Sequence, residues 1–178
     1  MNTVKIKDKT FKLSVPEAEI MKSIQIVANQ LNRDYEGKEP LLLSVLNGSF
    51  MFAADLIRML RMPCEISFVK MSSYEGTSTM GAVKQLIGLN QDIAGRDVII
   101  VEDIVESGIT MAEMIKLLNE KHPASVRVCT LLQKPNCLRI PLTVDYVAMK
   151  IPDDFIVGYG LDYDQGGRNL RDIYTVVE

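Results

Sequence analysis

Two acidic residues followed by a small, hydroxyl-bearing turn are the feature of this sequence most suited to chemistry. Glu102 and Asp103 follow an apolar run, and Ser107, Gly108 and Thr110 come shortly after them. This pattern places the acids where a parallel strand ends and the turn where a helix begins, which is where open α/β sheets bind ligands. The turn and the positive helix end would hold a phosphate, and the carboxylates would hold sugar hydroxyls or a hard cation. The predicted ligand is therefore a phosphate beside a ribose.

Two other interpretations of these residues remain open at this point. Acids followed by a helix cap are common, and such a cap stabilises a helix without any ligand. A receiver-like signalling domain would use Asp103 as its phosphate acceptor, although such domains carry their acid pair near the N-terminus and here the pair lies beyond residue 100. The only histidine, His122, stands at an expected helix end, where it suits the helix dipole. One histidine excludes a zinc site built from several.

Strands and helices alternate along the rest of the chain and would position these residues. Strand patterns lie at 41–46, 64–71, 97–101, 125–132, 144–149, 155–159 and 173–177. Helical periodicity lies at 15–35, 50–62 and 110–121, and Ser14 and Glu17 have the spacing of a capping box. The polar stretch 72–81 predicts a mobile surface loop. We therefore expect an α/β fold with a mainly parallel, twisted sheet and helices on both faces.

Length and composition limit the classes of protein to which the chain can belong. Its 178 residues, 47% of them hydrophobic, suffice for one core, so residues 1–178 are expected to form a single domain. Twenty Lys and Arg against 23 Asp and Glu give a net charge of −3, which disfavours nucleic acid and anionic membranes as partners. The N-terminus lacks the apolar run of a secretory signal, and three unpaired cysteines fit a reducing compartment, so we expect a cytoplasmic protein.

Residues 98–110 resemble the phosphoribosyl pyrophosphate signature of type I phosphoribosyltransferases. From Leu41 to the C-terminus, and in the leading helix, the chain resembles the hypoxanthine-guanine members of that family. The resemblance implies a purine salvage enzyme, a pentosyltransferase that moves the 5-phosphoribosyl group to N9 of hypoxanthine and, we expect, of guanine. It also implies a hood from the terminal segments, a mobile lid loop and a homodimer or homotetramer. The alternative is an RNA-binding regulator on the same fold without activity, which would need a basic face.

The resemblance assigns residues to the phosphate, ribose and pyrophosphate. Asn47 and Gly48 would contact pyrophosphate in a loop that usually contains a non-proline cis peptide, and Asn47 stands where many relatives carry Lys. The remaining positions are Ser73 and Tyr74 in the lid, Glu102 and Asp103 at the ribose hydroxyls directly or through a metal, Ser107, Gly108, Ile109 and Thr110 at the 5′-phosphate, Asp162 at Mg²⁺, and Arg168 at pyrophosphate. Relatives often carry bulkier residues than Gly166 and Gly167, which predicts a more mobile Arg168 before a ligand binds.

The resemblance also assigns residues to the purine. Glu106 matches the acid, Asp in most relatives, that takes a proton from N7 of the purine ring. Lys134 matches the lysine that donates to the 6-oxo group. Phe155 would stack on the purine, and Ile156 would offer main-chain contacts to its edge. The sequence does not decide the preference among hypoxanthine, guanine and xanthine.

Overall fold

A six-stranded, mainly parallel sheet forms the centre of the computed structural model, which describes residues 3–74 and 83–177. The strand order is β5-β4-β3-β6-β7-β8, and only β5 runs antiparallel to its neighbour. The strands are β3 (Leu41–Val45), β4 (Glu65–Tyr74), β5 (Val83–Ile87), β6 (Asp97–Val105), β7 (Ser125–Gln133) and β8 (Tyr146–Lys150). The predicted fold class is confirmed.

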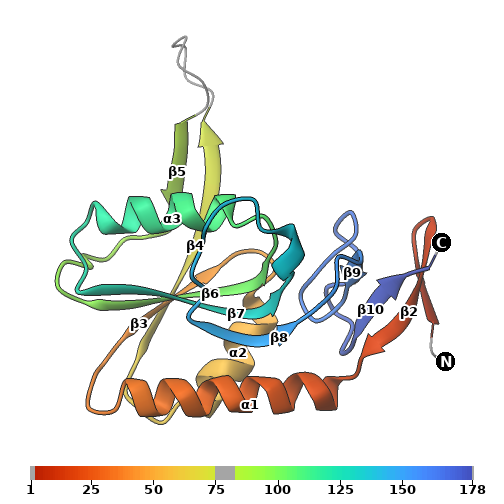
Figure 1. The fold of residues 1–178 in the computed structure, drawn as a ribbon, viewed down its shortest axis with the longest axis horizontal. Coiled ribbons are helices and arrows are strands. Elements are labelled where there is room, and N and C mark those ends of the chain that lie inside the picture. Colours follow the sequence, from red (N-terminus) through yellow and green to blue (C-terminus); the bar gives the residue numbers. More distant parts are fainter. Residues whose placement is uncertain (1–2, 75–82, 178) are drawn as a thin grey trace.

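Helices cover both faces of this sheet, as predicted. Helices α1 (Glu17–Asp34) and α2 (Phe50–Met59) lie on one face, and α3 (Ile109–Asn119) lies on the other (Figure 1). Within β3, Leu42 packs on the side of α1 and α2, whereas Leu41 and Leu43 pack on the side of α3. A strand buried on both faces favours apolar residues at nearly every position, which explains the run at 41–46, and its one polar residue, the buried Ser44, has its hydroxyl hydrogen-bonded to that of Ser49 (2.7 Å).

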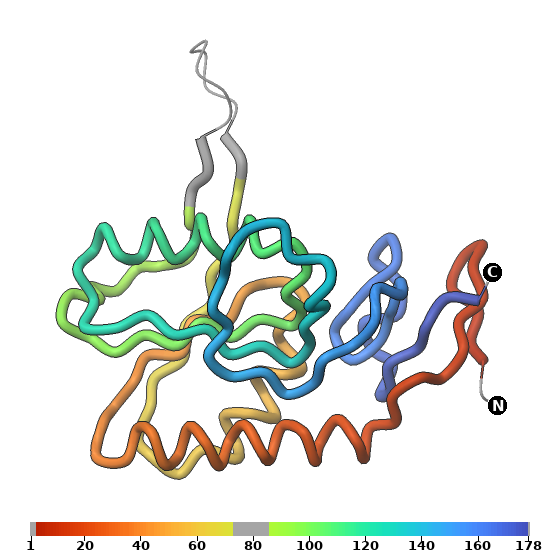
Figure 2. The backbone as a smooth tube through the Cα atoms, viewed as in Figure 1, coloured from red at the N-terminus to blue at the C-terminus, as the bar shows by residue number. Residues whose placement is uncertain are grey.

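The two ends of the chain together form a second, four-stranded antiparallel sheet. Its order is β1-β2-β10-β9, from β1 (Thr3–Ile6), β2 (Lys9–Val15), β10 (Ile173–Val176) and β9 (Ile156–Val157). Figure 2 shows that this sheet and both termini lie beyond one end of α1. It has its own small core of Ile6, Phe11 and Val157. The role of this sheet as a hood over the site stays a prediction.

Several local predictions differ from the structure. Ser14 lies in β2 and donates to the Ile173 carbonyl (3.0 Å), so the expected capping box is wrong. The Glu17 N–H at the start of α1 instead donates to Asp172 Oδ1 (2.7 Å). Residues 72–74 belong to β4 rather than to a loop, and 75–82 lie outside the described residues. The expected strand 155–159 is shorter in the structure, because only residues 156–157 pair with a neighbouring strand. Strands β1, β2 and β5 were not predicted.

Other observations agree with the sequence. His122 is exposed just beyond the end of α3, and Cys64, Cys129 and Cys137 are free thiols. None of the helices in the part of the chain that the structure describes has the length and apolarity to cross a membrane.

Candidate active site

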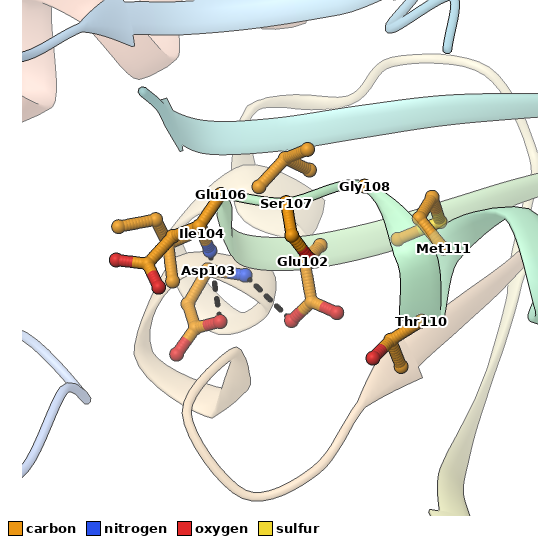
Figure 3. A pocket seen from close by; sticks show the side chains of 9 residues that line it. Glu102, Asp103, Ile104, Glu106, Ser107, Gly108, Thr110 and Met111 are labelled. Carbon is orange, nitrogen blue, oxygen red and sulfur yellow. Dashed lines mark hydrogen bonds between the residues drawn. The ribbon is translucent and has the colours of Figure 1, made fainter. Parts of the chain in front are cut away.

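The two acids lie where β6 extends beyond its neighbour β3. Pairing of β6 with β3 ends at Val101, whereas pairing with β7 continues to Val105. Glu102 and Asp103 therefore stand at an edge where one side of the strand has no partner in β3. Figure 3 shows their carboxylates on the same side of the chain as the Thr110 side chain. All three residues line the same cavity.

The acid pair is held by its own backbone, and each carboxylate disfavours the negative charge of the other. The Asp103 N–H donates to Glu102 Oε1 (3.0 Å), and the Ile104 N–H donates to Asp103 Oδ1 (2.8 Å). Burial, and then the neighbouring Asp103 charge, raise the pKa of Glu102 well above its usual range. Such a pair favours a ligand that brings hydrogen-bond donors or positive charge.

The turn between β6 and α3 leaves the beginning of the helix without a capping side chain. Gly108 has a left-handed φ of 78°, and a Cβ at this position would lie 3.2 Å from Leu138 and Leu142. Ser107 Oγ accepts a hydrogen bond from the Ile109 N–H (3.3 Å), and Thr110 is exposed in the first turn of α3. Apart from the Ile109 N–H, the N–H groups at the beginning of α3 have no capping side chain and can bind an anion, as the phosphate hypothesis requires.

A cavity of about 240 Å³ lies over this segment. The residues that line it are Glu102, Asp103, Ile104, Val105, Glu106, Ser107, Gly108, Thr110 and Met111. All belong to the segment that the sequence singled out or directly continue it. The cavity is therefore lined by carboxylates at one end and by the helix-opening turn at the other.

The loop after β3 is pressed against the acid pair. The Leu46–Asn47 peptide bond is cis, as the resemblance implied. A Cβ built on Gly48 would lie only 1.6 Å from Asp103 Oδ2, and a Cβ on Gly160 would lie 2.2 Å from the Gly48 carbonyl oxygen. Asn47 is exposed. Glycine at 48 and 160 is therefore what allows this loop to pass between the Asp103 carboxylate and the later chain.

Glu106 and Lys134 form an ion pair beside the cavity. Lys134 follows β7 and is 5% exposed, although a lysine that ends a strand is usually solvated. Glu106 is half exposed, and its Oε1 accepts from Lys134 Nζ. The Lys134 N–H also donates to the Val105 carbonyl (3.0 Å), which fixes the two strand ends together. The structure thus brings together two of the four residues assigned to the purine.

Phe155 offers part of its ring to solvent, while Ile156 is buried in β9. Phe155 is 43% exposed, and its ring packs against those of Phe11 (6.1 Å between centroids) and Tyr163 (5.8 Å). Its carbonyl accepts from the Val176 N–H (2.9 Å). The aromatic ring is therefore fixed along one side and available along another.

Asp162 and Arg168 lie on one turn and pair with each other. Arg168 Nη2 lies 2.8 Å from Asp162 Oδ1, and Arg168 Nη1 donates to the Gly160 carbonyl (2.8 Å). Cβ atoms on Gly166 and Gly167 would lie 2.8 and 2.7 Å from Ile6, so packing of β1 explains the absence of bulkier residues there. Arg168 is held by these contacts, and its predicted mobility stays a prediction.

The acidic residues assigned to a metal do not gather into one group. Among residues 3–74 and 83–177, no cluster of three or more His, Cys, Asp and Glu side chains is close enough to hold a metal ion. Glu102 and Asp103 are neighbours in β6, whereas Asp162 lies in the turn with Arg168. Ser73 and Tyr74, assigned to the lid, pair through their backbones with Lys84 and Val83 at the end of β4.

Comparison with known proteins identifies the family. The model of the phosphoribosyl transferase domain matches residues 17–164. The chain belongs to the phosphoribosyltransferase family. It is 43% identical to a hypoxanthine phosphoribosyltransferase from Salmonella typhimurium, across 94% of this chain and 96% of the relative. It is 46% identical to a hypoxanthine-guanine phosphoribosyltransferase from Mycobacterium avium, across 79% and 70%.

A solved structure agrees with this assignment. The phosphoribosyltransferase fold described above superposes on the crystal structure of a hypoxanthine-guanine phosphoribosyltransferase from Bacillus anthracis with a TM-score of 0.84 and 39% identity, covering 94% of this chain and 97% of the other. The resemblance drawn from the sequence is confirmed. The RNA-binding alternative finds no support, because these relatives are named as enzymes.

Two features of the site were not predicted from the sequence. Gly160 touches the Gly48 carbonyl, and Tyr163 packs against Phe155. Two glycines at 158 and 160, both with φ near 98°, were the available signal, because closely spaced glycines often mark an approach of backbone to backbone. The partner of that approach lies more than a hundred residues away in the sequence.

Proposed function

We propose that residues 1–178 act as one phosphoribosyltransferase domain that transfers the 5-phosphoribosyl group of phosphoribosyl pyrophosphate to N9 of hypoxanthine, and also of guanine. The products are inosine or guanosine monophosphate and pyrophosphate. The names of relatives about 42–46% identical to this chain support this substrate class. We also propose a cytoplasmic homodimer or homotetramer that binds neither nucleic acid nor membranes.

The observation that carries the proposal is the contact between Lys134 and Glu106 next to the phosphate turn. In a 6-oxopurine, the oxygen O6 and the nitrogen N7 lie on the same edge of the ring. A buried ammonium group and a half-exposed carboxylate in contact present a donor and an acceptor to such an edge. Lys134 would donate to O6 while Glu106 accepts the N7 proton.

The remaining residues then orient the sugar and the leaving group. Glu102 and Asp103 accept hydrogen bonds from the ribose hydroxyls, and the positive charge that develops on the ribose ring favours the ionised form of the pair. The α3 turn holds the 5′-phosphate, and Arg168 faces the departing pyrophosphate with a planar pair of donors. N9 attacks C1′ as pyrophosphate leaves, with inversion at C1′. We propose that a lid including Ser73 and Tyr74 excludes water during this step.

The oxygen donors present fit a magnesium ion shared with the substrate. Mg²⁺ usually takes one or two carboxylates from a protein and further oxygens from phosphates. Asp162, or the Glu102 and Asp103 pair, would hold it in this way, and a three-carboxylate cage is not required. When bound, the ion neutralises charge on the pyrophosphate group.

A steady-state assay with four bases tests the proposal. Nucleotide formation from phosphoribosyl pyrophosphate, Mg²⁺ and hypoxanthine, guanine, xanthine or adenine should favour the 6-oxopurines, because the 6-amino group of adenine presents donors to Lys134. Lys134→Ala should reduce hypoxanthine turnover much more than adenine turnover. The exposed Lys116 of α3 supplies the control, since Lys116→Ala should change neither.

Two results would contradict the proposal in different ways. Equal losses for hypoxanthine and adenine in Lys134→Ala would make Lys134 a general electrostatic residue. Binding of RNA by a wild-type protein that forms no nucleotide would refute the enzymatic function itself.

A further inference from the structure

The N-terminal hairpin of β1 and β2 packs against the turn that carries Asp162 and Arg168. Ile6 fills the space over Gly166 and Gly167, where Cβ atoms would approach it to 2.8 and 2.7 Å. The Tyr163 hydroxyl donates to Asp8 Oδ1 (2.8 Å), and Lys7 forms an ion pair with Asp164. Residues about 155 positions apart in the sequence thus hold one another at the proposed pyrophosphate subsite.

The same tyrosine also contacts the proposed purine-stacking residue. The Tyr163 ring meets the Phe155 ring edge to face, with centroids 5.8 Å apart and planes at 84°. Phe11 of β2, which is fully buried, lies 6.1 Å from both rings. Edge-to-face aromatic pairs are attractive in addition to the area they bury. Tyr163 and Phe11 therefore fix the orientation of a ring that is 43% exposed.

The backbone of Tyr163 closes the turn that precedes Arg168. The Tyr163 N–H donates to the Gly166 carbonyl, and the Gly166 N–H donates back to the Tyr163 carbonyl, both at 2.9 Å. Its neighbour Asp162 accepts from the Gln165 N–H (2.8 Å) and pairs with Arg168. A displacement of Tyr163 would thus move both charged residues of the turn.

We propose that Tyr163 is a positioning residue that couples the purine subsite to the pyrophosphate subsite, with Asp8 as its anchor on the N-terminal hairpin. Its ring orients Phe155, and its hydroxyl fixes the Asp162–Arg168 turn to the hairpin. The inference rests on the proposed function, because it takes Phe155 as the base-stacking residue and Arg168 as a pyrophosphate ligand. The reaction requires the purine and pyrophosphate subsites to keep a fixed position relative to each other, because N9 of the base attacks C1′ as pyrophosphate departs.

Two substitutions at Tyr163 separate the two contacts. Tyr163→Phe keeps the ring and removes the hydrogen bond to Asp8, so the KM for phosphoribosyl pyrophosphate should rise about three- to tenfold, the range of one hydrogen bond. Tyr163→Leu also removes the ring contact, so the KM for hypoxanthine should rise by about the same factor, the range of one aromatic pair. The value of kcat should stay within about threefold in both, since neither variant removes a reacting group.

A double-substitution cycle distinguishes this coupling from a loss of general stability. Asp8→Asn should raise the KM for phosphoribosyl pyrophosphate as Tyr163→Phe does, and the double variant should resemble either single variant rather than multiply their effects. Tyr174→Phe is the matched control. Tyr174 lies in β10 of the four-stranded sheet, and its hydroxyl also donates to an aspartate, Asp172 (3.4 Å). Both KM values should change less than twofold in this control.

These measurements distinguish a failure of this inference from a failure of the proposed function. A wild-type protein that forms no nucleotide would overturn the proposed function and this inference with it. An active wild type whose Tyr163→Phe and Tyr163→Leu variants keep both KM values, even with a loss of thermal stability, would overturn the inference alone. Multiplied effects in the double variant would show that Tyr163 and Asp8 act separately, which also contradicts it.

Discussion

Replacement of Gly48 by alanine would disturb the approach of the loop after β3 to Asp103 in the candidate active site. A Cβ there would lie 1.6 Å from Asp103 Oδ2 and 2.6 Å from Asp103 Cγ, whereas real Cβ contacts below 3.0 Å essentially never occur. Either the loop or the carboxylate must therefore move by about 1.4 Å, the difference between 3.0 and 1.6 Å. The carboxylate cannot turn away freely, because its Oδ1 holds the Ile104 N–H at 2.8 Å.

The displacement predicts a large loss of activity and a moderate loss of stability. A misplacement of about 1 Å among reacting groups can reduce the rate on the order of 100-fold, which corresponds to about 2.7 kcal/mol in activation free energy. Crowding of a packed site costs about 1–3 kcal/mol in unfolding free energy. We therefore expect kcat/KM of Gly48→Ala to fall about 100-fold in a protein that still folds.

Nucleotide formation and thermal unfolding of the same samples provide the assay. Gly37→Ala is the control, because Gly37 has a φ of 74° and open space around it. It should lose about 1–2 kcal/mol of stability through backbone strain while keeping its activity. In an Asp103→Ala background, Gly48→Ala should cost little further activity, since the clashing carboxylate is gone. Retention of kcat/KM within threefold by Gly48→Ala would refute the contact between this loop and Asp103.

Three further predictions concern the site and the core. Glu106→Gln should lower kcat about 100-fold under single-turnover conditions, whereas Glu106→Asp should keep substantial activity, because only the first loses the base for the N7 proton. Turnover of the Gln variant within a few-fold of wild type would disprove that role. Asp162→Asn should raise the Mg²⁺ concentration for half-maximal activity about tenfold, and an unchanged requirement would place Asp162 away from the ion. Burial, aided by the Asp97 charge, raises the pKa of Tyr35 to about 12. The unfolded chain therefore loses this proton first, so the stability from neutral Tyr35 is complete below pH 10 and is lost as the pH rises towards 12. Between pH 9 and 11 the free energy of unfolding, measured in urea, should accordingly fall by about 1.3 kcal/mol less in Tyr35→Phe than in wild type.

Local sequence patterns determined the central sheet and the segment that carries the chemistry. The apolar run at β3 and the periodicity of α1 and α3 depend on neighbours within a few residues, so they can be recognised without the fold. The segment from Glu102 to Thr110 is also local, because one strand end, one turn and one helix beginning supply all its groups. The predicted fold is confirmed, and this segment lines one cavity, while the chemistry assigned to its residues stays a prediction.

Contacts between distant segments were decided only by the tertiary structure. Asp172, rather than Ser14, caps α1, and Lys134 is buried against Glu106 instead of being solvated. Strands β1 and β2 were missed because a short hairpin is marginal by itself and here forms a sheet with β10 at the other end of the chain. Pairings of this kind depend on which surfaces the folded chain brings together. The positions of two residues in the sequence do not tell how close they lie in the fold. The acid pair could therefore be predicted from the sequence, whereas its contact with Gly48 could not.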